Sequence, residues 1–137
     1  MKKLYTLLAL TITFSMNAQL TTVTENGNTG QRLSTSNASN HGDIGSNAVD
    51  LSYSSGSSST RGATGSNAVA MGERTTASGS HSTAMGNDTT ASGVISTAMG
   101  SSSTASGTFS TAMGYDTTAS AINAIAMGYE TTASGSY

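Results

Sequence analysis

The second half of the chain repeats itself every fourteen residues. The tripeptide Ala-Met-Gly recurs at this spacing, and each copy is followed by a short run rich in Thr, Ala and Ser. The five units begin at Ser66, Ser80, Val94, Thr108 and Ile122, and Ser136 and Tyr137 begin a sixth. A weaker copy, SNAVDLS from Ser46, matches SNAVAMG from Ser66 at a distance of twenty, which is one period plus an insertion of six. A fixed short period of this kind is typical of a solenoid.

A fourteen-residue unit is too short for a pair of helices, which needs a repeat of roughly 34 residues. Each unit also contains glycine and a Thr-rich run, both of which disfavour a helix. Two short strands joined by tight corners fit the length, for example residues 82–86 and 89–93. Strands of successive units then pair in parallel about 4.8 Å apart. The sequence therefore predicts an all-β fold, a parallel β-solenoid of 14-residue coils.

Side chains alternate between the two faces of each predicted strand, so Thr83 and Met85 point one way and Ser82 and Ala84 the other. The methionines of this pattern form one ladder, Met71, Met85, Met99, Met113 and Met127. We expect them to form the core of the repeat inside the coil; the alternative is an apolar stripe on the outer face that needs a partner. One large apolar residue per coil offsets little of the entropy lost on ordering fourteen residues. Both interpretations therefore predict that further chains pack against the solenoid.

The glycine after each methionine is expected to form a corner of the coil, because glycine accepts a positive φ or a close backbone approach without steric strain. These corner positions are Gly72, Gly86, Gly100, Gly114 and Gly128. The last position of the unit is glycine in four of the five units and Ala121 in the unit that begins at Thr108, so we expect that position to tolerate a Cβ.

The chain begins with a segment that has the features of a secretory signal peptide. Lys2 and Lys3 precede an apolar run at residues 4–14, and Ala18 is the expected cleavage point. The run is about half of the ~20 residues that a membrane-spanning helix needs. We therefore divide the chain into a signal peptide at 1–18, a polar N-terminal leader or cap at 19–44, a degenerate repeat with a Ser-rich insertion at 45–65, and five repeats with the start of a sixth at 66–137.

Composition excludes several classes of function. The chain has no cysteine, and charged residues make up only 9% with a formal net charge of −2. Disulfides, thiolate metal sites and a basic surface for nucleic acid are therefore excluded. His41 and His81 are isolated in the sequence, and the acidic column Asp88, Asp116 and Glu130 lacks the glycine-rich pattern of calcium-binding rolls. We expect no metal site, no cofactor and no catalytic residues.

The repeats resemble the head repeat of the YadA-like trimeric autotransporter adhesins. Residues 67–72 read NAVAMG and residues 123–128 read NAIAMG, close to the family pattern NSVAIG, and the following TTASG is similar to its second strand. The resemblance covers residues 66–137 clearly and 45–65 weakly. It implies a left-handed parallel β-roll in which three identical chains pack side by side and share a core.

The same resemblance implies a function. Such heads attach to host matrix proteins, to cells or to surfaces, so it implies an exported, non-enzymatic adhesin head that forms a homotrimer and binds a matrix or cell-surface ligand. No stalk-forming heptad repeat follows the units, so we expect anchoring to a membrane only through a segment absent from this chain.

The residue pattern by itself is also compatible with two other functions. Thr-Ala-Ser recurs once per unit, starting at residues 76, 90, 104, 118 and 132, and places two hydroxyls on one face of each second strand. The resulting array resembles that of ice-binding solenoids. A passive spacer that only lengthens a fibre is the other alternative.

Overall fold

The computed structural model describes residues 19–135 of the chain. The predicted signal peptide at 1–18 and the start of the sixth unit at 136–137 lie outside the described residues. The description that follows concerns the remaining part.

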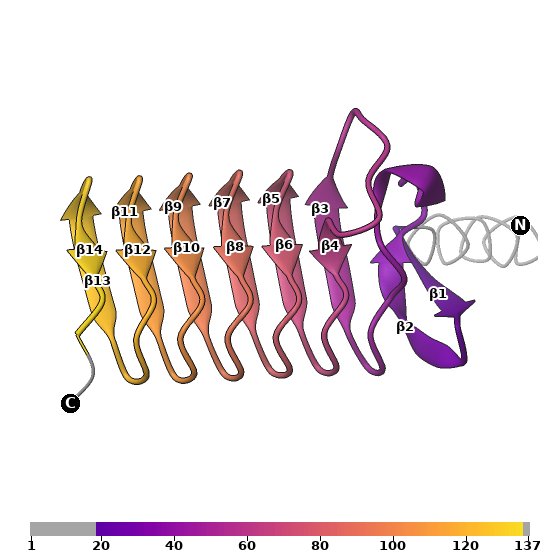
Figure 1. Ribbon diagram of the computed structural model, residues 1–137. Helices are drawn as coiled ribbons and strands as arrows, with labels where there is room; N and C mark the ends of the chain where they lie inside the picture. The colour runs from indigo at the N-terminus through magenta and orange to yellow at the C-terminus, as the bar shows by residue number, and fades with distance from the viewer. Residues whose placement is uncertain (1–18, 136–137) are drawn as a thin grey trace, which may run out of the picture.

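The described chain winds into a parallel β-solenoid, seen as a row of stacked coils in Figure 1. Each coil contributes one five-residue strand and one two-residue strand. The five-residue strands are β3 (Val49–Tyr53), β5 (Val69–Glu73), β7 (Thr83–Asn87), β9 (Thr97–Ser101), β11 (Thr111–Tyr115) and β13 (Ile125–Tyr129). The two-residue strands are β4 (Gly62–Ala63), β6 (Thr76–Ala77), β8 (Thr90–Ala91), β10 (Thr104–Ala105), β12 (Thr118–Ala119) and β14 (Thr132–Ala133). The predicted all-β solenoid is confirmed, with a second strand of two residues in place of five.

The strands of each kind form one sheet. The long-strand sheet has the order β1-β2-β3-β5-β7-β9-β11-β13, and the short-strand sheet has the order β14-β12-β10-β8-β6-β4. Equivalent residues of successive units are directly paired, as Met85 is with Met71 and with Met99. The weaker upstream copy follows the same rule, because Val49 pairs with Val69 at a distance of twenty. The six additional residues form part of the loop between β3 and β4, which stands out from the row of coils in Figure 1.

An antiparallel hairpin covers the first coil. Its strands β1 (Leu20–Glu25) and β2 (Asn28–Leu33) are joined by Asn26 and Gly27, whose φ angles of 48° and 80° form the tight turn that such a sequence favours. Strand β2 then pairs in parallel with β3, and a short 3-10 helix, η1 (Ala38–Asn40), follows. Backbone hydrogen bonds from Ser58 to Ser39 and from Gly42 to Arg61 fasten the β3–β4 loop to this region. We call residues 19–44 the N-terminal cap.

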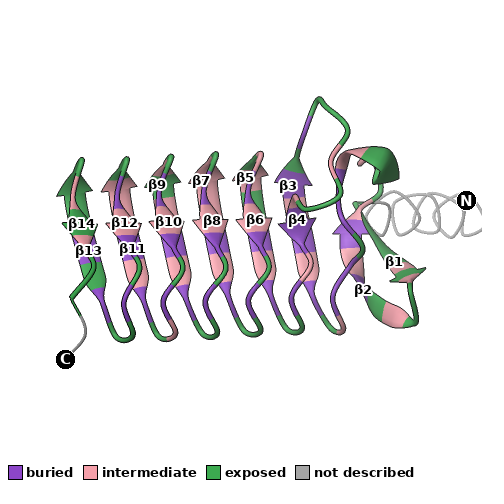
Figure 2. Ribbon diagram, in the orientation of Figure 1, coloured by how far each residue is buried: buried purple, intermediate pink, exposed green. Residues whose placement is uncertain are grey.

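Small side chains, chiefly alanine together with serine and threonine, and not methionine, fill the interior of the solenoid. The inward side chains of the long strands include Ala70, Ala84, Ala98, Ala112 and Ala126, and those of the short strands include Ala77, Ala91, Ala105 and Ala119. They form the buried band in Figure 2. From β5 onward, only two residues join each long strand to the following short strand, so the two sheets lie close and leave room for small side chains alone. The expectation that methionine is core inside the coil is therefore wrong, although the predicted alternation of Ser82 and Ala84 against Thr83 and Met85 is confirmed.

The glycines that follow the methionines lie inside the long strands rather than at the corners, which corrects that assignment. Their φ angles run from 109° to 134°, so the expected need for a positive φ is met. A Cβ on Gly100 would lie 2.0 Å from the carbonyl oxygen of Gly114 in the next coil. A Cβ on Gly107 would lie 1.9 Å from the carbonyl oxygen of Ala121, so the last position of the unit is also tight, and only Ala121 departs from glycine there.

Candidate functional site

The outer face of the long-strand sheet carries one apolar column and one column that mixes apolar residues with threonine, and we call this face the methionine face. One column is Val49, Val69, Thr83, Thr97, Thr111 and Ile125, and the other is Leu51, Met71, Met85, Met99, Met113 and Met127. Most of these side chains are half-buried within one chain, and those of Met71, Met127 and Ile125 are 38%, 59% and 65% exposed. Each coil adds one leucine or methionine to the apolar column. A contiguous exposed apolar surface of this kind is typical of a protein–protein interface.

The outer face of the short-strand sheet is polar. Ala91 of β8 points inward and is fully buried, whereas Thr90 is half-buried and Ser92 is exposed. The same division recurs in the neighbouring coils, so the predicted ladder of Thr and Ser hydroxyls is present on this face. The solenoid therefore has one apolar and one hydroxyl-bearing broad face.

Two edges separate these faces, and each edge turns through a residue with positive φ. The charged edge contains Glu73–Arg74, Asn87–Asp88, Ser101–Ser102, Tyr115–Asp116 and Tyr129–Glu130. The uncharged edge contains Ser66–Asn67, Ser80–His81, Val94–Ile95, Thr108–Phe109 and Ile122–Asn123. The second residue of each pair has a φ between 50° and 59°. In residues 66–135, every Asp, Glu and Arg lies on the charged edge.

Neighbouring coils are linked along the charged edge. Arg74 Nη2 donates a hydrogen bond to Asp88 Oδ2 at 3.0 Å. The rings of Tyr115 and Tyr129 stack with centroids 5.2 Å apart and planes 9° from parallel. A hydrogen bond with Glu130 raises the pKa of the Tyr129 hydroxyl. This edge thus offers charged and aromatic groups in a regular column.

A cluster of polar side chains that sequence reasoning missed lies between the N-terminal cap and β3, and we call it the cap network. It consists of Glu25, Arg32, His41, Asp50 and Ser52. Arg32 is buried, and its Nη1 and Nη2 donate to the two carboxylate oxygens of Glu25 at 2.8 and 3.1 Å. Its Nη2 also donates to the carbonyl oxygen of Gly42 at 2.9 Å, and its Nε lies 3.4 Å from Asp50 Oδ2. Because Arg32 lies on β2 and Asp50 on β3, the network joins the cap to the first coil.

The cap network brings together a histidine, an aspartate and a serine. His41 Nδ1 lies 3.1 Å from Asp50 Oδ2 and 3.4 Å from Ser52 Oγ, and Ser52 Oγ donates to Asp50 Oδ1 at 2.6 Å. In a catalytic triad, the serine and the aspartate contact different nitrogens of the ring. Here both contact the same nitrogen and all three side chains are buried, so the arrangement is structural. His81, by contrast, is exposed on the uncharged edge.

The cap network makes stability depend on pH in acid. Burial alone raises the pKa of Glu25, but hydrogen bonds from Arg32 and from the Ile44 N–H outweigh it and lower the pKa. Burial likewise raises the pKa of Asp50, but its contacts with His41 and Ser52 outweigh it and lower the pKa. Each folded-state pKa lies below the unfolded value of about 4, so the stabilisation is complete above that pH and is lost as the pH falls through the folded-state values.

We therefore expect the melting temperature to fall steeply below about pH 4. Calorimetry of the purified chain between pH 7 and pH 3 measures this dependence. Glu25→Gln removes one of the two groups and is expected to make the fall shallower. Asp116→Asn changes an exposed carboxyl and serves as the control, which is expected to follow the unmodified chain. Equal slopes for the unmodified chain and the Glu25→Gln variant would contradict the role of this carboxylate.

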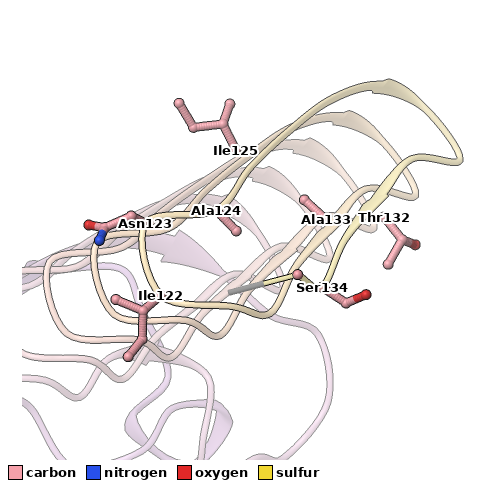
Figure 3. A pocket seen from close by; sticks show the side chains of 8 residues that line it. Ile122, Asn123, Ala124, Ile125, Thr132, Ala133 and Ser134 are labelled. Atoms are coloured by element: carbon pink, nitrogen blue, oxygen red, sulfur yellow. The ribbon is translucent and has the colours of Figure 1, made fainter. Parts of the chain in front are cut away.

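A hollow lies over the last described coil. Ile122, Asn123, Ala124, Ile125, Thr132, Ala133, Ser134 and Gly135 line it, as Figure 3 shows. Its floor is the alanine interior of the coil, and it presents no charged side chain. Among residues 19–135, no three His, Asp or Glu side chains lie close enough together to hold a metal ion. Within that same stretch, no helix has the length and apolar character needed to cross a membrane.

Comparison with known proteins identifies the repeat. The family model described as YadA head domain repeat (2 copies) matches residues 63–89, 91–117 and 119–137, which together make up more than half of the chain. Neither a curated protein nor a solved structure matches the chain. Heads of the YadA type are adhesin-type domains of the cell surface that form trimers. The chain belongs to the YadA head domain repeat family.

Proposed function

We propose that the chain is the exported head of a trimeric adhesin, in which three copies lie side by side with their methionine faces turned toward a common axis. The observation that carries this proposal is the methionine face itself. Its methionine column runs from Leu51 in β3 to Met127 in β13, and small side chains already fill the interior of one coil. The methionines therefore stay partly exposed within one chain, and neighbouring copies would cover them.

The hydroxyl-bearing face and the exposed edges would then lie on the outside of the trimer and be available to a ligand. We propose that this ligand is a matrix protein or a molecule of a cell surface, and that the head has no enzymatic activity. Three copies of each outer surface in one particle would increase the strength of attachment through multivalency. The predicted signal peptide supports export.

The triple substitution Met85→Gln, Met99→Gln and Met113→Gln tests this proposal. Glutamine has nearly the shape of methionine but loses hydration energy when its amide is buried without a partner, so the trimer is expected to dissociate. Light scattering at fixed chain concentration measures the mass of the particle. Binding of fluorescent protein to cultured cells and to immobilised matrix protein measures attachment, which is expected to fall at least tenfold with the loss of multivalency.

The matched control places the same three changes on the opposite face, as Thr90→Gln, Thr104→Gln and Thr118→Gln. These positions are half-buried in one chain as well, so the control tests whether glutamine itself disturbs the coil. We expect the control protein to remain trimeric. A monomeric unmodified chain, or a trimer that attaches to neither substrate, would overturn the proposed function.

A further inference from the structure

We propose that neighbouring chains of the trimer meet edge to edge and coil by coil, with the uncharged edge of one chain against the charged edge of the next. This inference rests on the trimer proposed above and specifies the contacts that close it. The partner surface is therefore a second copy of this chain.

The position of the two edges leads to this arrangement. The long strand of each coil begins beside the uncharged edge and ends at the charged edge, so the edges flank the methionine face on its two sides. If three such faces turn toward one axis, each chain presents its uncharged edge to one neighbour and its charged edge to the other. Rotation about an axis parallel to the solenoid does not change the position of a coil along that axis. Each coil would therefore contact the same coil of the next chain.

In three of the coils, the side chains of the two edges are complementary in this register. In the coil of β7, His81 on one edge would face Asp88 on the other. In the coil of β9, the large side chain of Ile95 would face the small side chains of Ser101 and Ser102. In the first of these coils an imidazole would therefore lie opposite a carboxylate, and in the second a bulky side chain would lie opposite two small ones.

The coil of β11 shows the same match with aromatic rings. Phe109 on the uncharged edge would face Tyr115 on the charged edge. Tyr115 is already stacked on Tyr129 of the next coil, so the phenylalanine would join an aromatic column. Aromatic groups of this kind are enriched in protein interfaces.

The backbone at Ile95 and Phe109 supports the same conclusion. Their φ angles are 55° and 59°, a left-handed conformation that asparagine adopts readily and that is unfavourable for branched or bulky side chains. Asn47, Asn67 and Asn123 occupy the equivalent position in other coils. Ile95 and Phe109 are also 48% and 52% exposed, so their side chains gain little within their own chain. Contact with a neighbouring chain would explain why isoleucine and phenylalanine, rather than asparagine, occupy these two positions.

Engineered disulfides test the register directly, because the native chain has no cysteine. The double variant Phe109→Cys, Tyr115→Cys places one thiol on each edge of the same coil. The two positions lie at opposite ends of the five-residue strand β11, which is roughly 16 Å long at 3.3 Å per residue, so they cannot join within one chain. After mild oxidation of the purified full chain, we expect most of the protein to migrate as a covalent trimer on a non-reducing gel.

The matched control is Phe109→Cys, Asn87→Cys. Asn87 occupies the position of Tyr115 two coils earlier, an offset of about 9.6 Å, which is beyond the reach of a disulfide. We expect no covalent trimer from this pair. A trimer by light scattering that cross-links through the control pair, or through neither pair, would overturn the same-coil register while leaving the trimer intact. A monomer by light scattering would instead overturn the proposed trimer on which the register rests.

The single variant Phe109→Asn gives an independent readout that does not require cysteine. Asparagine suits the left-handed backbone better, so the isolated coil is expected to fold at least as well. Loss of an interface aromatic is nevertheless expected to raise the chain concentration at which half of the trimer dissociates by about tenfold or more. An unchanged dissociation concentration would overturn the contact and would point to an external ligand for this edge.

Discussion

Replacing Gly100 by valine is expected to destabilise the solenoid by about 3 kcal/mol or more, the sum of backbone strain and overpacking. The φ of Gly100 is 109°, which a β-branched residue adopts only with strain, and its Cβ would lie 2.0 Å from the carbonyl oxygen of Gly114. The next coil must move for the side chain to fit, and its ladder hydrogen bonds would break. Urea unfolding at one chain concentration measures the loss of stability.

Ala121→Val is the comparison for this prediction. Ala121 already carries a Cβ, so the substitution adds two methyl groups to an existing side chain and is expected to cost about 1 kcal/mol. The difference between the two variants isolates the contribution of the positive φ and the close backbone approach. Equal unfolding midpoints would contradict the strict requirement for glycine after methionine.

Replacing Arg32 by methionine is expected to destabilise the N-terminal cap by about 3–5 kcal/mol. The substitution keeps the apolar stem of the side chain but removes the charge that Glu25 and Asp50 share. Asp50 is almost fully buried, so its carboxylate would keep the desolvation penalty without the neighbouring cation. Chemical unfolding measures the loss, and hydrogen exchange is expected to locate it in β1, β2 and β3.

Arg74→Met provides the control, because Arg74 forms an ion pair of similar length with Asp88 on the exposed charged edge. An exposed pair contributes little, so this variant is expected to change stability by about 0.5 kcal/mol or less. If the two substitutions lowered stability equally, burial of the cap network would not be the source of its effect.

The period of the sequence was sufficient to predict the topology. A fixed spacing of fourteen makes every residue pair with its equivalent in the next coil, and the observed pairing of Met85 with Met71 and Met99 follows directly. The alternation of side chains was equally predictable, because neighbouring residues of a strand point to opposite faces. These features depend on local geometry alone.

The direction of the methionines was not predictable in the same way. Ala84 and Thr83 are both small enough to be inside, so the pattern of one strand leaves the choice of face open. The distance between the two sheets decides it, and this distance depends on the corner at Asp88 and Thr89, where only two residues connect β7 to β8. A methionine does not fit that space, whereas an interface between chains accepts it.

Two signals in the sequence pointed to the remaining features. Asn26-Gly27 is a strong signal for a hairpin turn and marks the cap. Asp50 stands where the next repeat has Ala70, so the repeat itself places a carboxylate inside the solenoid, where it needs a partner. Asn and Asp at the corners are similarly suited to a left-handed backbone, which explains why glycine is not required there.

The direct contact between equivalent glycines has a consequence for how such proteins change length during evolution. Gly100 touches the backbone of Gly114, and any insertion that shifted one coil against the next would place a side chain in that contact. Duplication or deletion of a whole repeat keeps every contact, and changes the reach of the head by about 4.8 Å per unit. The loop between β3 and β4 shows where extra residues are accepted, since it leaves the solenoid at an edge and returns in register. Recombination between similar repeats can therefore change the length of this head in discrete steps while the fold stays the same.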